Sequence, residues 1–174
     1  MIYLDEINFT KRSLKVRDWS VKNTNLTVDQ KEVYVGYRSV IASMTEEKGI
    51  SLILIYEHAI NSADFCYYLK KLRIKFGKQP IALFMDRLAV HKSKDVKEWW
   101  GKLNIKPIFN VSYSPEFNPI EAVFSKVKRQ FNSQRLNSLV NKIGFNSANQ
   151  IETAFKAIKV DHCASCVRKS FFLL

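Results

Sequence analysis

The sequence predicts an α/β fold in which a mixed sheet is flanked by helices. Two patterns predict it: apolar runs typical of antiparallel strands fill the first third of the chain, and strand-like and helix-like runs then alternate. A third observation is that hydrophobic residues make up 47% of the 174 positions. A chain of this length and composition can bury the core of one domain. We therefore expect a single domain over residues 1–174.

The N-terminal third is predicted to form an antiparallel meander. Its candidate strands are a short apolar run over 2–4 that ends at Asp5, an alternating piece over 15–20, a run over 33–41 and a run over 50–55. Residues 45–49 separate the last two runs and carry a glycine near their end, as hairpin loops do.

From residue 61 onward, helical and strand-like periods alternate. The expected order is a helix from Asn61 that Gly77 ends, a strand over 81–85, a helix capped by Ser93 and a strand over 105–109. The run 81–85 is continuously apolar, which is typical of a central strand buried on both faces.

Two further helices are predicted near the C-terminus. Asn118 suits an N-cap and Pro119 the first helical position, which needs no backbone N–H. An inward stripe follows at positions 120, 123, 124, 127 and 131. A last helix is expected from Ser147, with Gln150 completing a capping box and core residues at 151, 155 and 158.

Three acidic residues occupy positions where side chains can meet at one edge of this sheet. Asp5 and Asp86 each end a predicted strand, and Glu121 opens a predicted helix. Open α/β sheets form their sites at such strand ends. Grouped acids repel and raise one another's pKa, and a pair of divalent cations would remove that penalty. Each acid also has a structural interpretation, as a solvated strand end, a turn cap or a helix-dipole partner.

The charge balance indicates a polyanionic partner. Lys and Arg number 28 against 16 Asp and Glu, which gives a net charge of +12. Nucleic acid is the commonest intracellular polyanion, and the alternative is a merely soluble basic protein. No apolar run reaches the ~18 residues of a membrane helix, and the N-terminus has an acidic pair where a signal peptide would be basic. We therefore expect an intracellular protein without a membrane partner.

The cysteines predict neither a disulfide framework nor a zinc site. There are three, and the CxxC pair Cys163 and Cys166, preceded by His162, has no second pair to complete four ligands. We expect buried thiols on a C-terminal helix.

The nine residues from Tyr113 to Glu121, YSPEFNPIE, resemble the YSP-D/E-x-NPIE block of mariner-type transposases and their bacterial insertion-sequence relatives. The intervening residues 87–120 give the 34-residue spacing typical of that family between Asp86 and Glu121, and His91 follows Asp86 as expected. Residues 2–6 match the segment that carries the family's first acid, here Asp5. Residues 17–19 resemble a basic-x-Trp element, and the likeness covers about residues 1 to 135.

This resemblance implies a ribonuclease-H-like fold and metal-dependent DNA strand cleavage and strand transfer. It implies that a DDE triad of Asp5, Asp86 and Glu121 holds two Mg²⁺ or Mn²⁺ ions. His91, Arg87 and Asn118 are expected beside these ligands. Contacts to DNA are expected from Lys92, Lys126, Lys128, Arg129 and Arg135. A homodimer within a transposition complex is the expected assembly, in the nucleus of a eukaryote or otherwise in the cytoplasm, at the nucleoid.

The chain also departs from the family pattern. Arg87 replaces the usual asparagine, and it could hold a phosphate or pair with Asp86. Phe124 stands where tryptophan is common. The family's N-terminal helix-turn-helix DNA-binding region is expected to be absent. These departures favour an alternative, a domesticated or decayed transposase that only binds nucleic acid. A third hypothesis is a nuclease of the same fold that acts on RNA–DNA hybrids. The NPIE block at residues 118–121 argues against it. Glu6 and Glu116, beside the mapped acids, are expected to be solvated.

Overall fold

One mixed sheet organises the part of the chain that the structure describes. The structure is a computed structural model that describes residues 1–10, 36–141 and 143–171. Within these residues the sheet has the order β3-β2-β1-β4-β5. Its strands are β1 (Ile2–Phe9), β2 (Arg38–Thr45), β3 (Gly49–Tyr56), β4 (Ile81–Met85) and β5 (Ile105–Phe109). Strand β2 runs antiparallel to its neighbours β1 and β3, and β4 and β5 run parallel to β1. The predicted α/β fold with a mixed sheet is confirmed.

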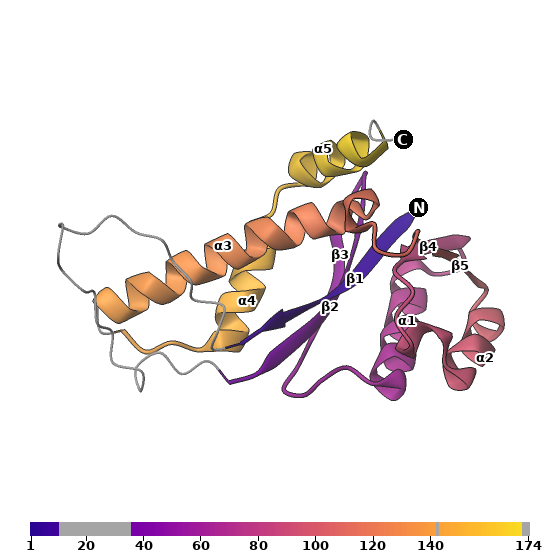
Figure 1. Ribbon diagram of the computed structural model, residues 1–174, viewed down its shortest axis with the longest axis horizontal. Helices are drawn as coiled ribbons and strands as arrows, with labels where there is room; N and C mark the ends of the chain where they lie inside the picture. The colour runs from indigo at the N-terminus through magenta and orange to yellow at the C-terminus, as the bar shows by residue number, and fades with distance from the viewer. Residues whose placement is uncertain (11–35, 142, 172–174) are drawn as a thin grey trace.

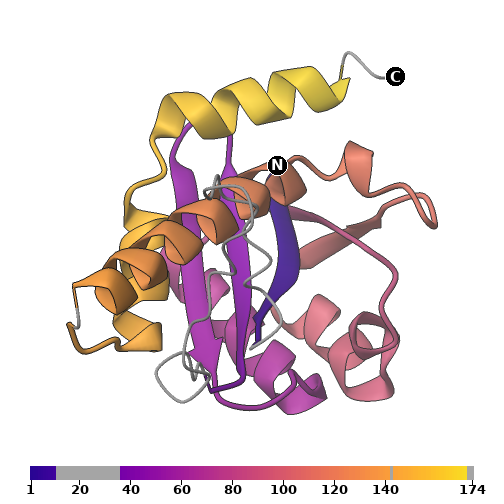
Figure 2. The same cartoon turned by 60° about the vertical axis from the view of Figure 1, so that its left-hand side comes forward.

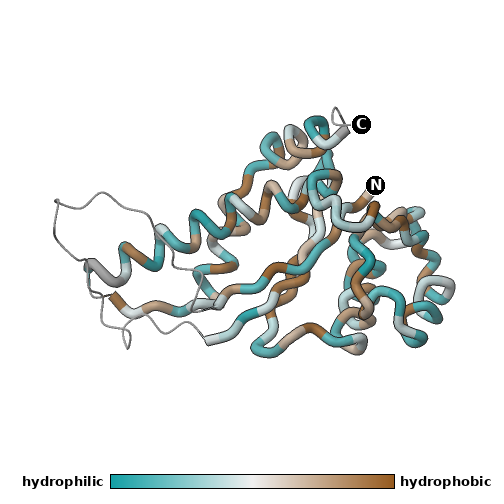
Figure 3. Tube along the Cα trace, viewed as in Figure 1, coloured by the Kyte–Doolittle hydropathy of each residue, from teal (hydrophilic) through white to brown (hydrophobic). Residues whose placement is uncertain are grey.

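Helices cover both faces of this sheet (Figure 1). One face carries α1 (Ser62–Phe76) and α2 (Lys94–Lys102), and the other carries α3 (Pro119–Val140), α4 (Ser147–Lys156) and α5 (Val160–Phe171). Figure 2 shows α3 crossing the strands. Each face has its own apolar core. Figure 3 shows hydrophobic residues along the strands and alternating hydropathy along α3.

The pleat of β1 sends its successive side chains to opposite cores. Tyr3 and Ile7 enter the core beneath α3, whereas Ile2 and Leu4 enter the core beneath α1. The prediction that the strand ends at Asp5 is wrong, because β1 continues to Phe9 and pairs with β2 along that length. Asp5 therefore lies within a strand.

The β2–β3 hairpin confirms the predicted loop over residues 45–49. Gly49 has φ +67°, and a Cβ there would lie 3.3 Å from the Cα of Val160 at the start of α5. Glycine therefore permits both the turn and the close approach of α5. The pieces predicted over 15–20 and 33–35 lie outside the described residues.

Most predicted helix signals are confirmed. Asn61 caps α1 through a capping box with Asp64, and the Ser93 hydroxyl accepts from the Val96 N–H at the start of α2. The whole predicted stripe of α3 is buried. The capping box expected for α4 is wrong, because the side chain of Asn146, one residue earlier, accepts the Asn149 N–H.

The C-terminal helix α5 follows α4 and carries the CxxC pair. Both Cys163 and Cys166 are buried, as expected, and α5 packs against α3 and β3. A membrane-spanning helix is absent from the described residues, since the apolar stretches there are too short.

Candidate active site

The three predicted acids line one cleft between β1, β4 and the start of α3. The cleft has a volume of about 490 Å³, and Asp5, Asp86 and Glu121 share it with Arg87 and Lys92. The parallel register explains the meeting of the two aspartates. Ile2 pairs with Leu83 and Tyr3 with Phe84, so the same offset brings Asp86, just past β4, alongside Asp5. Pro119 then begins α3 and places Glu121 in its first turn.

Asp5 is the most buried of the three acids. Its Oδ2 accepts a hydrogen bond from Asn118 Nδ2 at 3.0 Å, and its Oδ1 accepts the Glu6 N–H at 2.8 Å. Burial, followed by the charges of Glu6 and Glu121, raises the pKa of Asp5 to about 8. The cluster therefore carries a repulsion that a bound cation would relieve.

Asn118 immediately precedes α3, but its side chain does not cap the helix as predicted. The amide instead reaches back to β1, where Nδ2 donates to the Leu4 carbonyl at 3.1 Å and to Asp5. The Asn118 backbone carbonyl accepts the Glu121 N–H at 3.1 Å. One buried residue thus fixes the distance between the first acid and the helix that carries the third.

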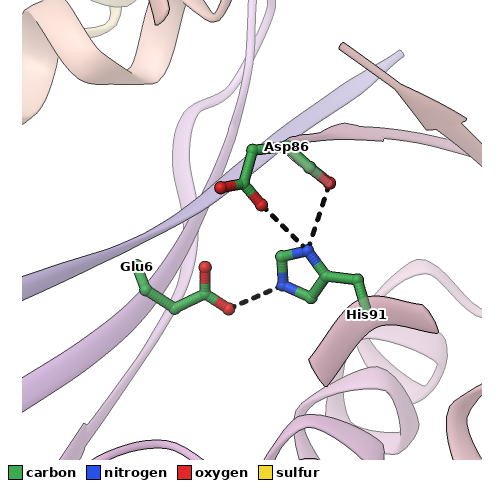
Figure 4. Close-up of side chains that lie close together, drawn as sticks. All are labelled: Glu6, Asp86 and His91. Carbon is green, nitrogen blue, oxygen red and sulfur yellow. Dashed lines mark hydrogen bonds and ion pairs between the residues drawn. The ribbon is translucent and has the colours of Figure 1, made fainter. Parts of the chain in front are cut away.

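His91 links Asp86 to an acid on the other face of the sheet, Glu6 (Figure 4). Its Nδ1 lies 3.0 Å from Asp86 Oδ1, and its Nε2 lies 2.8 Å from Glu6 Oε1. The ring is fully buried and packs on Phe65 of α1, with ring centroids 4.5 Å apart. Burial alone would lower the pKa of His91, but the hydrogen bonds to Asp86 and Glu6 raise it to about 10.

Both ring nitrogens of His91 point at carboxylates, Nδ1 at Asp86 and Nε2 at Glu6. Glu6, Asp86 and His91 offer atoms within 4.8 Å of one another, and each ring nitrogen is already within hydrogen-bond distance of a carboxylate oxygen. His91 acts as a donor that orients Asp86. Burial alone would raise the pKa of Asp86, but the hydrogen bonds from His91 and the Leu88 N–H hold it below its usual value.

Glu121 is half-buried at the edge of the cleft. Burial raises its pKa, and the nearby charge of Lys128, two turns further along α3, opposes the shift. The expectation that Glu6 is solvated is wrong, because the side chain of Glu6 is only 10% exposed and is paired with His91. Glu116 is exposed, as expected.

Arg87 does not form the ion pair with Asp86 that one interpretation required. Its Nε donates to the Asn110 carbonyl at 2.9 Å, and among the described ion pairs Asp86 has only His91 as a partner. The side chain is exposed and lines the cleft. The guanidinium is therefore available for an anionic group that enters the cleft.

The basic residues expected to bind DNA divide into three groups. Lys92 lines the cleft, and Lys128 lies near Glu121. Lys126 and Arg129 lie near α5, where their charges, added to burial, lower the pKa of His162. Arg135 is only 2% exposed, and its DNA contact stays a prediction. It continues the buried stripe of α3 four residues after Phe131, a signal already present in the sequence.

The donor set fits a hard divalent cation. Three carboxylates line one open cleft, and oxygen ligands of this kind suit Mg²⁺ and Mn²⁺. Burial and the charges of Glu6 and Glu121 raise the pKa of Asp5, and a bound cation would oppose this shift. The Asn118 and His91 hydrogen bonds orient two of the three carboxylates, as partners of metal ligands commonly do.

Comparison with known proteins identifies relatives of the chain. A family model described as DDE superfamily endonuclease matches residues 1–141. A search of curated proteins finds no match.

Several solved structures share the fold. The Mos1 transposase paired-end complex with left transposon end is 14% identical with a TM-score of 0.68, over 97% of this chain and 51% of that one. The Mos1 transposase catalytic domain with Raltegravir and Mn is 13% identical with a TM-score of 0.58, over 78% and 71%. A simian T-cell lymphotropic virus intasome complex is 13% identical with a TM-score of 0.60, over 90% and 47%.

These matches concern the fold. The chain spans about half the length of the transposase chain in the paired-end complex. The match to this complex covers 97% of the present chain. It confirms the ribonuclease-H-like fold that the resemblance implied.

Proposed function

Since the chain belongs to the family of DDE superfamily endonucleases, we propose that it is the catalytic domain of a mariner-type DNA transposase. Its substrate would be a DNA phosphodiester, and its reactions would be strand cleavage followed by transfer of the cut end to another DNA. The observation that carries the proposal is the convergence of Asp5, Asp86 and Glu121 in one cleft that also holds cationic side chains.

Asp5, Asp86 and Glu121 would hold the metal, as two Mg²⁺ or Mn²⁺ ions. When bound, such a pair activates the attacking water or hydroxyl and stabilises the leaving oxygen of a phosphodiester. The mutual repulsion of the acids supports this assignment. Mos1 catalytic domain structures contain Mn or Mg, which agrees with the choice of ion.

The surrounding residues would position the ligands and the DNA. Asn118 holds the Asp5 carboxylate through Nδ2, and His91 holds the Asp86 carboxylate through Nδ1. Arg87 and Lys92 would pair with phosphates in the cleft, because they line it and are exposed. Lys128 would meet the backbone beside Glu121. Such contacts are independent of base sequence.

The partners of the chain would be DNA and a second copy of the chain. The net charge of +12 supports the first. The matched Mos1 structure is a paired-end complex, which supports the second. Sizing of the chain with and without a DNA duplex tests the assembly, and a complex with a single protein chain at every ratio would argue against it.

A nicking assay tests the proposed activity. The purified chain should convert supercoiled plasmid to the nicked form with Mg²⁺ or Mn²⁺, and a chelator should abolish this. Asp86→Ala and Glu121→Ala should each lose more than about 100-fold of the rate, since even residues that only support metal ligands are commonly worth 10- to 100-fold.

Glu116→Ala serves as the matched control, because Glu116 is an exposed acid in the same motif and does not line this cleft. It should nick at the wild-type rate. Equal traces of nicking in the wild type and both acid variants would mark a contaminating nuclease and reject the proposal. Metal-independent DNA binding without any nicking would identify a decayed, binding-only relative.

A further inference from the structure

Tyr113 stands at the rim of the candidate active site with its side chain fully exposed. It lies in the segment between β5 and α3, which projects away from the sheet (Figure 2). Large aromatic side chains usually cover apolar surface. Tyr113 instead leaves its side chain exposed beside the cleft.

The backbone of Tyr113 is also strained. Its φ is +59°, in the left-handed region that bulky residues rarely adopt and that glycine adopts freely. A tyrosine that served only as a solvated turn residue would gain nothing to offset this cost. Unfavourable backbone conformations persist where the surrounding structure imposes them, and they concentrate at functional sites.

The surrounding structure here is a hydrogen-bond network centred on Asn110, which is buried. Asn110 Nδ2 donates to the Ser114 carbonyl at 2.7 Å, and Asn110 Oδ1 accepts the Val111 N–H at 2.8 Å. The Asn110 N–H donates to the Met85 carbonyl at the end of β4, one residue before Asp86. The loop that presents Tyr113 is thereby tied to the strand that presents the second acid.

The cleft beside Tyr113 is lined by cations as well as acids. Arg87 is anchored to the same Asn110 through its carbonyl, and Lys92 lies in the same lining. A strand of nucleic acid that entered here would meet positive charge for its phosphates and an aromatic face for a base. This combination is the one that single-strand binding grooves use.

We propose that the ring of Tyr113 stacks on an unpaired base. This base would lie next to the phosphodiester that is cleaved at Asp5, Asp86 and Glu121. The inference rests on the proposed function, because it takes DNA to be the occupant of the cleft. It adds a preference, namely that the chain binds DNA better where a base near the reacting phosphate is unstacked from the duplex. The ring, and not the hydroxyl, carries the contact.

The test compares two DNA probes on four proteins. The probes are a hairpin duplex with a blunt end and the same duplex with a short overhang carrying 2-aminopurine, both bound in Ca²⁺ without cleavage. The proteins are the wild type, Tyr113→Phe, Tyr113→Gly and Asn104→Gly. Tyr113→Gly removes the ring and relieves the left-handed backbone, so the variant should fold at least as stably as the wild type.

Asn104→Gly is the matched control, since Asn104 also has a positive φ, of +48°, and does not line this cleft. Affinities come from fluorescence anisotropy, and stacking is read from the quenching of 2-aminopurine. Equal affinity for the overhang probe is expected of the wild type, Tyr113→Phe and Asn104→Gly. Each of these proteins should also quench the fluorescence of that probe's 2-aminopurine. Tyr113→Gly should bind that probe about 5- to 150-fold more weakly, the range measured for loss of one stacked base.

On the blunt probe all four proteins should agree within about twofold, since backbone contacts alone hold it. The inference fails if Tyr113→Gly retains wild-type affinity for the overhang, or if it loses both probes equally. A Tyr113→Phe variant as weak as Tyr113→Gly would overturn the role of the ring. If the wild type nicks plasmid but binds the overhang probe no better than the blunt probe, this inference alone is rejected. If the wild type binds no DNA, the proposed function is rejected as well.

Discussion

At the scale of single residues, Glu6 and its neighbour Asp5 face opposite sides of the sheet and still serve one site. Asp5 lines the cleft, while Glu6 pairs with the buried His91, whose other nitrogen holds Asp86. Glu6 therefore acts on the candidate metal ligand through His91. A role of this kind should alter metal affinity more than it alters DNA binding.

The variant Glu6→Ala tests this role. Loss of the acceptor for His91 Nε2 should free the ring and lower the apparent Mn²⁺ affinity about 10- to 100-fold, while Glu6→Gln, which keeps an acceptor oxygen, should lose less. A Mn²⁺ titration of plasmid nicking measures both. Glu98→Ala is the control, because Glu98 is an exposed acid paired with Lys102 on α2. Unchanged Mn²⁺ affinity in Glu6→Ala would contradict the role.

At the scale of elements, α5 makes stability depend on pH through a buried thiol. Burial raises the pKa of Cys163 to about 11 from 9.0. The folded state then holds its proton more tightly than the unfolded state. The stability that this proton contributes is complete below pH 9 and is lost as the pH rises to about 11.

Replacing the thiol should remove that part of the pH dependence. The wild type should lose more stability between pH 9 and pH 11 than Cys163→Ala, although other groups with raised pKa, such as Tyr56 and Cys66, titrate in both proteins. Urea unfolding of the two proteins at pH 8, 9.5 and 11 gives the comparison. Equal losses of stability in the two proteins would show that the Cys163 thiol does not contribute to this pH dependence.

At the scale of the whole molecule, the charge of +12 predicts DNA binding that weakens steeply with salt. Lys128 lies beside Glu121, so its charge should meet a phosphate near the cleft. Lys128→Ala should lower the slope of log K against log[KCl] by about 1 and weaken binding similarly on unrelated sequences.

Anisotropy titrations of a DNA duplex over a range of KCl concentrations measure that slope. Lys156→Ala is the control, since Lys156 is an exposed cation of α4 that pairs with Glu152. A slope unchanged in Lys128→Ala, or reduced as much in Lys156→Ala, would remove Lys128 from the DNA path.

Short-range sequence patterns predict most of the helices and strands, because helix caps and apolar stripes depend on residues close together in the chain. The Asn61 and Ser93 caps, the Gly77 helix end and the stripe of α3 depend on neighbours within a few residues, and the structure has all of them. The prediction that β1 ends at Asp5 fails because pairing with a distant strand sets that end. Polar Asp5 and Glu6 interrupt the apolar run, and only pairing with β2, a distant segment, keeps them in the strand.

Residue patterns predicted the mixed sheet and acids at strand ends and a helix start, and the resemblance to mariner-type transposases singled out Asp5, Asp86 and Glu121 by their motifs and spacing. The tertiary structure decided how the side chains around these acids meet. Glu6 meets His91 across 85 positions of sequence, Asn118 meets Asp5 across 113, and Asn110 holds Tyr113 at the rim of the cleft. The directions of side chains and the register of parallel strands are properties of the packed sheet, and no local pattern in the chain encodes them.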